Sequence, residues 1–288
     1  MKSSRYEELK LDEIRDLIRD CPIAYLASGP MEAHGPHGPV GLDALKAHAI
    51  CLRAARQYGG VAYPPLFAGQ QACALPYAGN VYIRPETARA LYRDLLVCLE
   101  RTGFQVIVLM SGHYPEGGLI REVAADFMIN GMTPVLALCE KDAAWDVMQG
   151  DHAGRWETSL MLELHPDLVE MSRLPADRSV KPPAMLGCDA RDADPIEGAR
   201  AVGTIVKRVG GLAAHLLDQR RRGTNHGALF AQFCRTELQM EQLAGSTNLG
   251  QAYATHPLLA RYREAFWACA FEQADELQRQ LRGEVFGR

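Results

Sequence analysis

"PIAYLASGPMEAHGPHGPVGLDALKAHAICLRAARQYGG", residues 22–60, is the stretch that decides the fold. It begins with a short apolar run, passes through a loop rich in glycine and proline, and continues as an Ala- and Leu-rich segment. Uninterrupted apolar runs are typical of strands buried on both faces, and glycine often follows the end of a helix. The stretch therefore predicts a strand over 22–29, a connecting loop, and a helix over 43–60.

The same order of strand and helix recurs along the chain. Apolar runs predict further strands over 61–67, 104–112 and 133–139. Helical spacing and end signals predict further helices over 8–20, 85–103 and 114–131. Alternation of this kind favours a mostly parallel sheet covered by helices on both faces. We therefore predict an α/β fold, a single-domain α/β/α sandwich.

The C-terminal third is expected to be mainly helical. One amphipathic helix is predicted over 191–222, with a break at Gly210-Gly211, and strong helical character is predicted over 257–282. "GTNHG" (223–227) and "AGSTNLGQ" (244–251) are expected to form loops. We divide the chain into a main domain, 1–222, and a helical C-terminal extension, 223–288, packed on the same domain.

Composition narrows the class of protein. The 288 residues are 48% hydrophobic and carry a net charge of −4, which is ordinary for a globular chain with a sizeable core. The sequence contains no stripe of basic residues of the kind that binds nucleic acid. It also contains no apolar run that approaches the roughly 18 residues of a membrane span. The first twenty residues alternate charges and contain no apolar run, so we do not expect them to be a secretory signal, and the eight cysteines form no CxxC pair. We expect reduced thiols and a cytoplasmic location.

Three polar clusters stand where strands are predicted to end or a helix to begin. They contain Glu32, His34, His37 and Asp43; then His113 and Glu116 in "SGHYPEGG"; then Asp151, His152 and Glu157 in "GDHAGRWETSLMLEL". Taken singly, Asp43 is equally consistent with a helix cap and Glu157 with an exposed first helical turn. Taken together, imidazoles and carboxylates at one edge of a parallel sheet predict a zinc, manganese or iron site.

A resemblance to the creatininase family adds to this interpretation. "GPMEAHGPHGPVGLD", residues 29–43, resembles the family signature Gly-x-x-Glu-x-His-Gly-Pro-His-x-Pro-x-x-x-Asp, and "SGHYPEGG" and "DHAGRWETSLMLELHPDLV" resemble two further family motifs. The resemblance implies a creatininase-like fold with two divalent metal ions. It assigns Glu32, His34, Asp43 and His113 as ligands, with Asp43 as the bridging carboxylate.

The resemblance also implies an activity. Family members hydrolyse carbon–nitrogen bonds of small cyclic amides or formamides, one branch trims a peptide precursor, and several assemble as homohexamers. We therefore expect a small-molecule amide substrate and a homo-oligomer. This chain departs from creatininase proper, because Pro115 separates the His113-Tyr114 pair from Glu116. Either Glu116 reaches the place of the usual carboxylate ligand or Glu157 completes the site, and we favour Glu157.

The expected nucleophile is a hydroxide held between the two ions. His152 is the candidate acid for the departing nitrogen, with an orienting role as its alternative, and the Gly117-Gly118 amides are candidates for binding the oxyanion. His37 is expected to orient a ligand. Tyr82, Tyr114 and Trp156 are expected to contact substrate.

Two other classes of function remain open from the residues alone. One is a metal-dependent hydrolase of a different bond, such as a lactone, a carbon–carbon bond or a small peptide. The other is a metal-containing binding protein without turnover.

Overall fold

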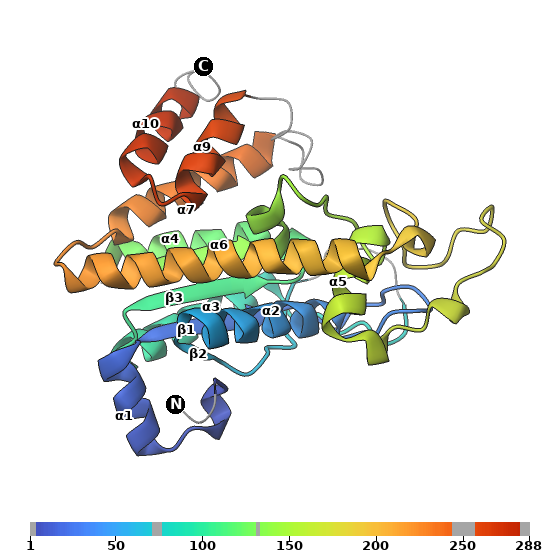
Figure 1. Ribbon diagram of the computed structural model, residues 1–288, viewed down its shortest axis with the longest axis horizontal. Helices are drawn as coiled ribbons and strands as arrows, with labels where there is room; N and C mark the ends of the chain where they lie inside the picture. Colours follow the sequence, from blue (N-terminus) through green and yellow to red (C-terminus); the bar gives the residue numbers. More distant parts are fainter. Residues whose placement is uncertain (1–3, 71–76, 131–132, 244–256, 283–288) are drawn as a thin grey trace.

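The computed structural model describes residues 4–70, 77–130, 133–243 and 257–282. Its centre is a four-stranded sheet with the order β2-β1-β3-β4, in which all pairs are parallel (Figure 1). The strands are β1 (Ile23–Ser28), β2 (Val61–Ala62), β3 (Val106–Ser111) and β4 (Val135–Cys139). Every residue of these strands is buried, as expected of a sheet covered on both faces. The predicted α/β architecture is confirmed.

The register of the two central strands brings their carboxyl ends level. Ile23 pairs with Val106 at one end, and Ser28 pairs with Ser111 at the other. The loops that leave β1 and β3 therefore start side by side, which is where ligands bind in parallel sheets.

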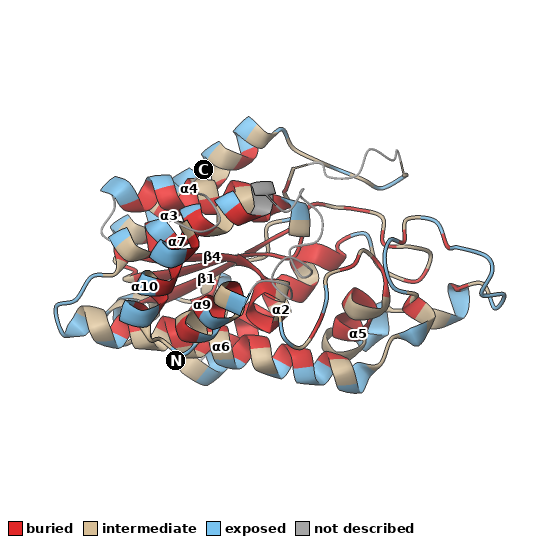
Figure 2. Ribbon diagram, turned by 90° about the horizontal axis from the view of Figure 1, so that it is seen from above, coloured by how far each residue is buried: buried red, intermediate tan, exposed pale blue. Residues whose placement is uncertain are grey.

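Helices lie on both sides of the strands, and Figure 2 shows α3 and α4 on one side and α2 and α6 on the other. The helices are α1 (Leu11–Asp20), α2 (Leu42–Tyr58), α3 (Pro85–Thr102), α4 (Gly117–Asn130), α5 (Arg155–Leu164), α6 (Pro195–Arg221), α7 (Gly227–Leu243), α9 (Pro257–Trp267) and α10 (Phe271–Leu281). Short 3-10 turns are η1 (Tyr6–Glu8), η2 (Tyr114–Glu116), η3 (Glu140–Ala144), η4 (Pro166–Leu168), η5 (Met171–Arg173) and η6 (Ala190–Asp192).

Several predicted boundaries were wrong for local reasons. The strand expected over 61–67 is only Val61–Ala62, because Pro64 and Pro65 have no N–H to donate to a ladder. The helix expected over 114–131 begins as the 3-10 turn η2, and the stretch 257–282 forms two helices. Cys269, between them, has a φ of 59°, which a helix does not allow. The loop predicted over 244–251 lies outside the described residues.

The predicted break at Gly210-Gly211 is also wrong, because α6 is continuous through both glycines. A Cβ on Gly210 would lie 2.2 Å from Cδ2 of Tyr58, at the end of α2. The glycine therefore lets two helices on the same side of the sheet approach closely. The need for close packing between the helices explains why position 210 is a glycine, and a helix break does not.

We expect Gly210→Ala to destabilise the protein by about 1–3 kcal/mol, because the new methyl group displaces the Tyr58 ring. Gly203→Ala is the matched control on the same helix, since its Cβ meets no described atom within 4 Å. That control should gain about 0.5–1 kcal/mol from helix propensity. Urea unfolding measures both, and equal effects of the two substitutions would contradict the packing explanation.

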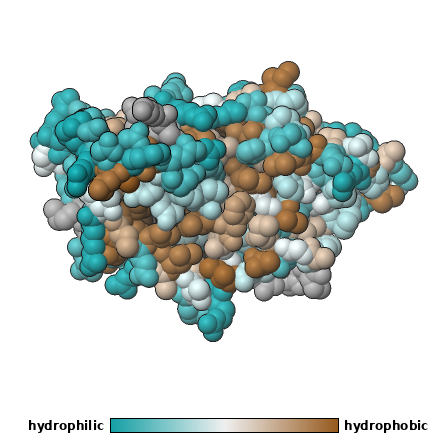
Figure 3. Space-filling view, turned by 90° about the horizontal axis from the view of Figure 1, so that it is seen from below, coloured by the Kyte–Doolittle hydropathy of each residue, from teal (hydrophilic) through white to brown (hydrophobic). Residues whose placement is uncertain are grey.

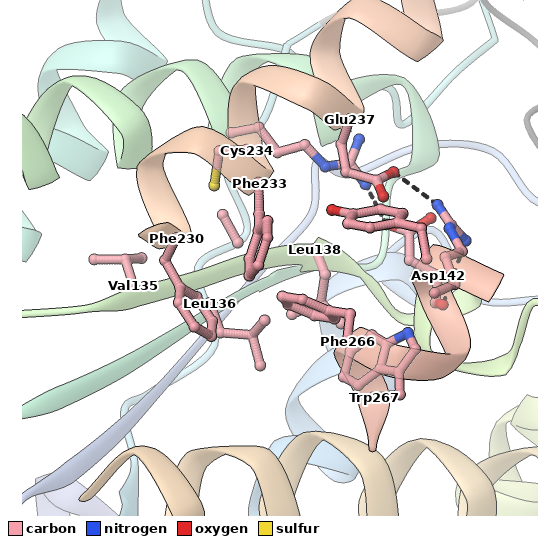
Figure 4. A pocket seen from close by; sticks show the side chains of 14 residues that line it. Val135, Leu136, Leu138, Asp142, Phe230, Phe233, Cys234, Glu237, Phe266 and Trp267 are labelled. Carbon is pink, nitrogen blue, oxygen red and sulfur yellow. Dashed lines mark hydrogen bonds and ion pairs between the residues drawn. The ribbon is translucent and has the colours of Figure 1, made fainter. Parts of the chain in front are cut away.

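The C-terminal helices cover the edge strand β4. In Figure 4, Phe233 and Phe266 point toward Leu136 and Leu138 of this strand, around a cavity of about 40 Å³. The cavity is largely apolar and small, so it suits packing better than chemistry. The division of the chain at residue 222 stays a prediction, although α6 ends at Arg221 and α7 begins at Gly227.

The surface mixes polar and apolar side chains. Figure 3 shows brown apolar areas between teal polar ones on the lower face of the molecule. Among the described residues, no helix has the length and apolarity that a membrane span requires.

Candidate metal centre

Asp43 lies where β1, β3 and α2 meet. A Cβ on Gly29, after β1, would lie 2.4 Å from the Asp43 Cβ, and a Cβ on Gly112, after β3, would lie 2.0 Å from the Asp43 carbonyl oxygen. A side chain at either glycine would push the first turn of α2 away from the strands. The two glycines therefore allow Asp43 to lie between the strand ends.

The two carboxylate oxygens of Asp43 face two different imidazoles. Oδ2 lies 3.2 Å from Nδ1 of His113, and Oδ1 lies 3.3 Å from Nε2 of His34. All three side chains are buried. Because each oxygen has its own histidine, Asp43 has the arrangement needed of a ligand shared by two cations.

Two groups of candidate ligands therefore meet at Asp43. The first, subsite 1, is Glu32, Asp43 and His113; the second, subsite 2, is His34, Asp43 and Glu157. In each group one ligand atom per residue lies within 4.8 Å of the others. Four of these five residues were the predicted ligands, and Glu157 was the favoured fifth.

The hydrogen bonding of His34 suits a metal ligand. Its Nδ1 lies 2.9 Å from the Glu32 carbonyl oxygen, which can only accept, so Nδ1 carries the proton. Its Nε2 is buried and has no hydrogen-bond partner among the described residues. With Nδ1 held by this carbonyl, Nε2 is the nitrogen that would lose its proton and ligate an ion in subsite 2, in the manner of metal-binding histidines.

Negative charge is in excess at the centre. Burial lowers the pKa of His34, but Asp43 and Glu157 outweigh it and raise that pKa to about 9. Burial likewise opposes protonation of His113, whereas Asp43 and Glu32 raise its pKa to about 10. Both imidazoles take up protons because three carboxylates surround them, and a divalent cation would supply the same compensation.

Helix α5 presents Glu157 to subsite 2. Asp151 accepts hydrogen bonds from the backbone N–H groups of Trp156 and Glu157, at 2.9 and 3.1 Å, and so caps this helix. Burial and the neighbouring Glu157 raise the pKa of Asp151 to about 7. The Ala153 N–H donates to Glu157 Oε2 at 2.8 Å, which fixes the oxygen that faces His34.

Lys46 is a buried cation that the sequence analysis missed. It lies one helical turn after Asp43, is fully buried, and places Nζ 2.9 Å from Glu140 Oε1 and in contact with Glu157 Oε1. Burial raises the pKa of Glu140 to about 7, and Lys46 opposes the shift. A lysine within the apolar stretch "ALKAHAICL" was the available signal, because an unpaired buried lysine is rare.

Comparisons with known proteins place the chain in a family. A sequence model of the creatininase family, described as creatinine amidohydrolase, matches residues 7–211, which is most of the chain. The chain belongs to the creatininase family.

Individual relatives differ in what they act on. Creatinine amidohydrolase from Pseudomonas putida is 31% identical over 189 residues, which cover 56% of this chain and 71% of that protein. A mycofactocin precursor peptide peptidase from Mycolicibacterium smegmatis is 30% identical over 168 residues, which cover 54% of this chain and 63% of the peptidase. The solved structure named "Creatininase Mn" is 24% identical, with a TM-score of 0.63 over 73% of this chain and 97% of its own. This last likeness shows a shared fold.

Glu116, the alternative carboxylate, is a member of neither subsite. Its Oε2 accepts a hydrogen bond from Ser111 Oγ at 2.9 Å, and burial raises its pKa. It belongs to none of the groups that could hold a metal among the described residues. The geometry therefore favours Glu157 over Glu116 as the fifth ligand.

A pocket of about 250 Å³ opens beside subsite 1. Its lining includes Glu32, Ala33, His152, Tyr77, Asn80 and the segment 181–186. Tyr82 is not in the lining but donates a hydrogen bond to Glu32 Oε1 at 3.2 Å, and Asn80 in turn donates to the Tyr82 hydroxyl at 3.0 Å. Tyr82 and Asn80, the second of which the sequence analysis missed, therefore orient Glu32.

Two predicted substrate contacts lie elsewhere. The Tyr114 ring is packed between Lys46 and Lys141, whose Nζ atoms lie 4.5 and 4.3 Å from its centroid. Trp156 stacks under Arg155, at 5.1 Å, and packs against the core. Neither ring lines the pocket. Gly117 and Gly118 begin helix α4, and the Gly117 N–H donates to the Tyr114 carbonyl, so this amide is already engaged within the chain. The oxyanion role of the two amides stays a prediction.

The remaining two histidines occupy different positions. His152 lines the pocket, its Nε2 lies 3.0 Å from the Ala33 carbonyl oxygen, and its ring lies 4.4 Å from that of His34. With Glu32 and His34 it forms a third group compatible with a metal. His37 Nε2 lies 2.9 Å from Thr158 Oγ1, beside Glu157, and burial lowers its pKa to about 4. A neutral His37 is thus placed to orient α5.

Proposed function

We propose that the protein is a metal-dependent amidohydrolase that cleaves a carbon–nitrogen bond of a small cyclic amide or formamide. The observation that carries the proposal is Asp43, whose two oxygens face His34 and His113 in two adjoining ligand groups. The proposed cofactors are two divalent ions, with zinc, manganese or iron suited to this mixed nitrogen and oxygen set.

The residues around the centre divide the chemistry. Two bound ions would polarise the amide carbonyl and bring a water molecule near its reactive, deprotonated form at neutral pH. Asp43, His34, His113, Glu32 and Glu157 would hold them. His152 lines the pocket beside the centre and would give a proton to the departing nitrogen, which is a poor leaving group when it is not protonated.

A small peptide is the second candidate substrate, because one relative is described as a peptide peptidase. The pocket volume of about 250 Å³ favours a small amide over an extended chain. The homo-oligomeric state and the cytoplasmic location stay predictions.

The experiment is reconstitution followed by a substrate screen. Protein stripped with a chelator would be loaded separately with zinc, manganese or iron and tested on lactams, formamides and dipeptides. We expect turnover of at least one small amide, dependent on added metal. If the protein took up metal but hydrolysed none of the compounds, the alternative of a metal-containing binding protein would be favoured. Hydrolysis by the stripped protein would contradict the proposal that the activity depends on metal.

We expect His152→Gln to lower kcat by about a hundredfold with little change in KM, because a general acid acts mainly in the transition state. Metal content should stay at the wild-type level, which separates a proton donor from a ligand. Loss of an ion in this variant would instead assign His152 to the third ligand group, with Glu32 and His34.

A further inference from the structure

The segment 181–187 is a fixed wall of the pocket beside the metal centre. Leu186 and His152 exchange backbone hydrogen bonds at 2.8 and 2.9 Å, and the Ala184 N–H donates to the Tyr77 hydroxyl at 3.1 Å. Ala184 has a φ of 51°, a conformation that non-glycine residues rarely adopt, whereas Gly187 accommodates its φ of 94° as a glycine can. A strained, hydrogen-bonded loop beside a centre of this kind is a candidate for substrate binding.

The side chains of this wall are mostly apolar and include one positive charge. Pro182, Pro183, Met185 and Leu186 contribute apolar surface to the pocket. Lys181 begins the segment, is exposed, and is the only lysine or arginine among the described residues that line the pocket. Within the described parts of the chain it has no hydrogen bond or ion pair, unlike most surface arginines here. Its ammonium group is therefore available to a ligand.

We propose that the substrate is an amide carrying a carboxylate, which Lys181 binds while the amide lies against Glu32 and His152. The inference rests on the proposed function and names its substrate class. A single ammonium matches one negative charge, whereas recognition of a phosphate generally recruits an arginine fork or a helix N-terminus as well. The apolar wall favours a compact hydrocarbon portion between the amide and the carboxylate.

The test uses pairs of lactams and N-formyl compounds, each as the free carboxylate and as the neutral carboxamide, on metal-loaded enzyme. The wild type should prefer the carboxylate member by about two- to fivefold in kcat/KM, the size expected of one partly exposed ion pair. Lys181→Met should abolish this preference through KM with kcat unchanged, Lys181→Arg should retain it, and Lys181→Glu should reverse it.

Lys207→Met is the matched control, because Lys207 lies exposed on α6 and does not line the pocket. It should keep the full preference. Equal turnover of both members by the wild type, or a preference that survives Lys181→Met, would overturn the inference and leave the amidohydrolase proposal standing. If no carboxylate or carboxamide compound of any pair were turned over, both the proposed substrate class and the amidohydrolase proposal would be overturned.

Discussion

Asp43→Ala is expected to abolish hydrolysis, with a loss in kcat of at least about ten-thousandfold. Asp43 turns one oxygen toward the histidine of each subsite, so its removal should open both subsites at once. Metal catalysis supplies several kcal/mol of transition-state stabilisation, and each 1.36 kcal/mol corresponds to a factor of ten in rate. Steady-state kinetics on the best substrate of the screen, with elemental analysis of the same preparation, measures the effect.

Variants that open one subsite each are the controls for Asp43→Ala. His113→Ala opens only subsite 1, and His34→Ala opens only subsite 2. Each should lose about one equivalent of metal, whereas Asp43→Ala should lose both. If Asp43→Ala lost no more metal than His113→Ala, Asp43 would be an ordinary ligand of one ion and the shared-carboxylate arrangement would be wrong.

Lys46→Met is expected to destabilise the metal-free protein by about 3–5 kcal/mol at pH 7. The substitution keeps the side-chain length but leaves Glu140 and Glu157, both buried, without their cation. Urea unfolding in the presence of a chelator measures the free energy of unfolding. Lys207→Met, on the exposed face of α6, should change it by less than about 0.5 kcal/mol.

The loss in Lys46→Met should depend on pH. Folding raises the pKa of Glu140 from its ordinary value of 4.5 to about 7, and removal of Lys46 raises it further. A carboxyl group with a raised folded pKa stabilises the folded state at low pH and loses that contribution as pH rises through the folded value. The deficit should therefore shrink from pH 7 to pH 5, and Lys46→Met/Glu140→Gln should show a smaller deficit at pH 7. A deficit that is independent of pH and of Glu140 would contradict the charge explanation.

The layout of strands was predictable because their apolar runs are continuous. Burial of β1 and β3 on both faces follows directly from "IAYLAS" and "VIVLMS". The break predicted at Gly210-Gly211 failed because a glycine looks the same in the sequence whether it breaks an element or lets another approach. Gly210 lies within an unbroken helix because Tyr58 packs on it, and that contact joins residues distant in the chain.

The ligand groups were largely predictable, whereas their surroundings were not. Glu32, His34 and Asp43 share one short loop and the start of a helix, so local spacing and the family resemblance were informative. Lys46, Glu140 and Asn80 act through contacts between separate segments, which no spacing encodes. The aromatic rings were hardest to assign, since Tyr114 follows a predicted ligand directly and yet packs between two lysines.

A crystal structure of the metal-loaded protein, with anomalous scattering recorded at the absorption edge of the bound metal, would locate the ions. We expect two anomalous peaks, one among Glu32, Asp43 and His113 and the other among His34, Asp43 and Glu157. A single peak, or peaks away from Asp43, would contradict this expectation.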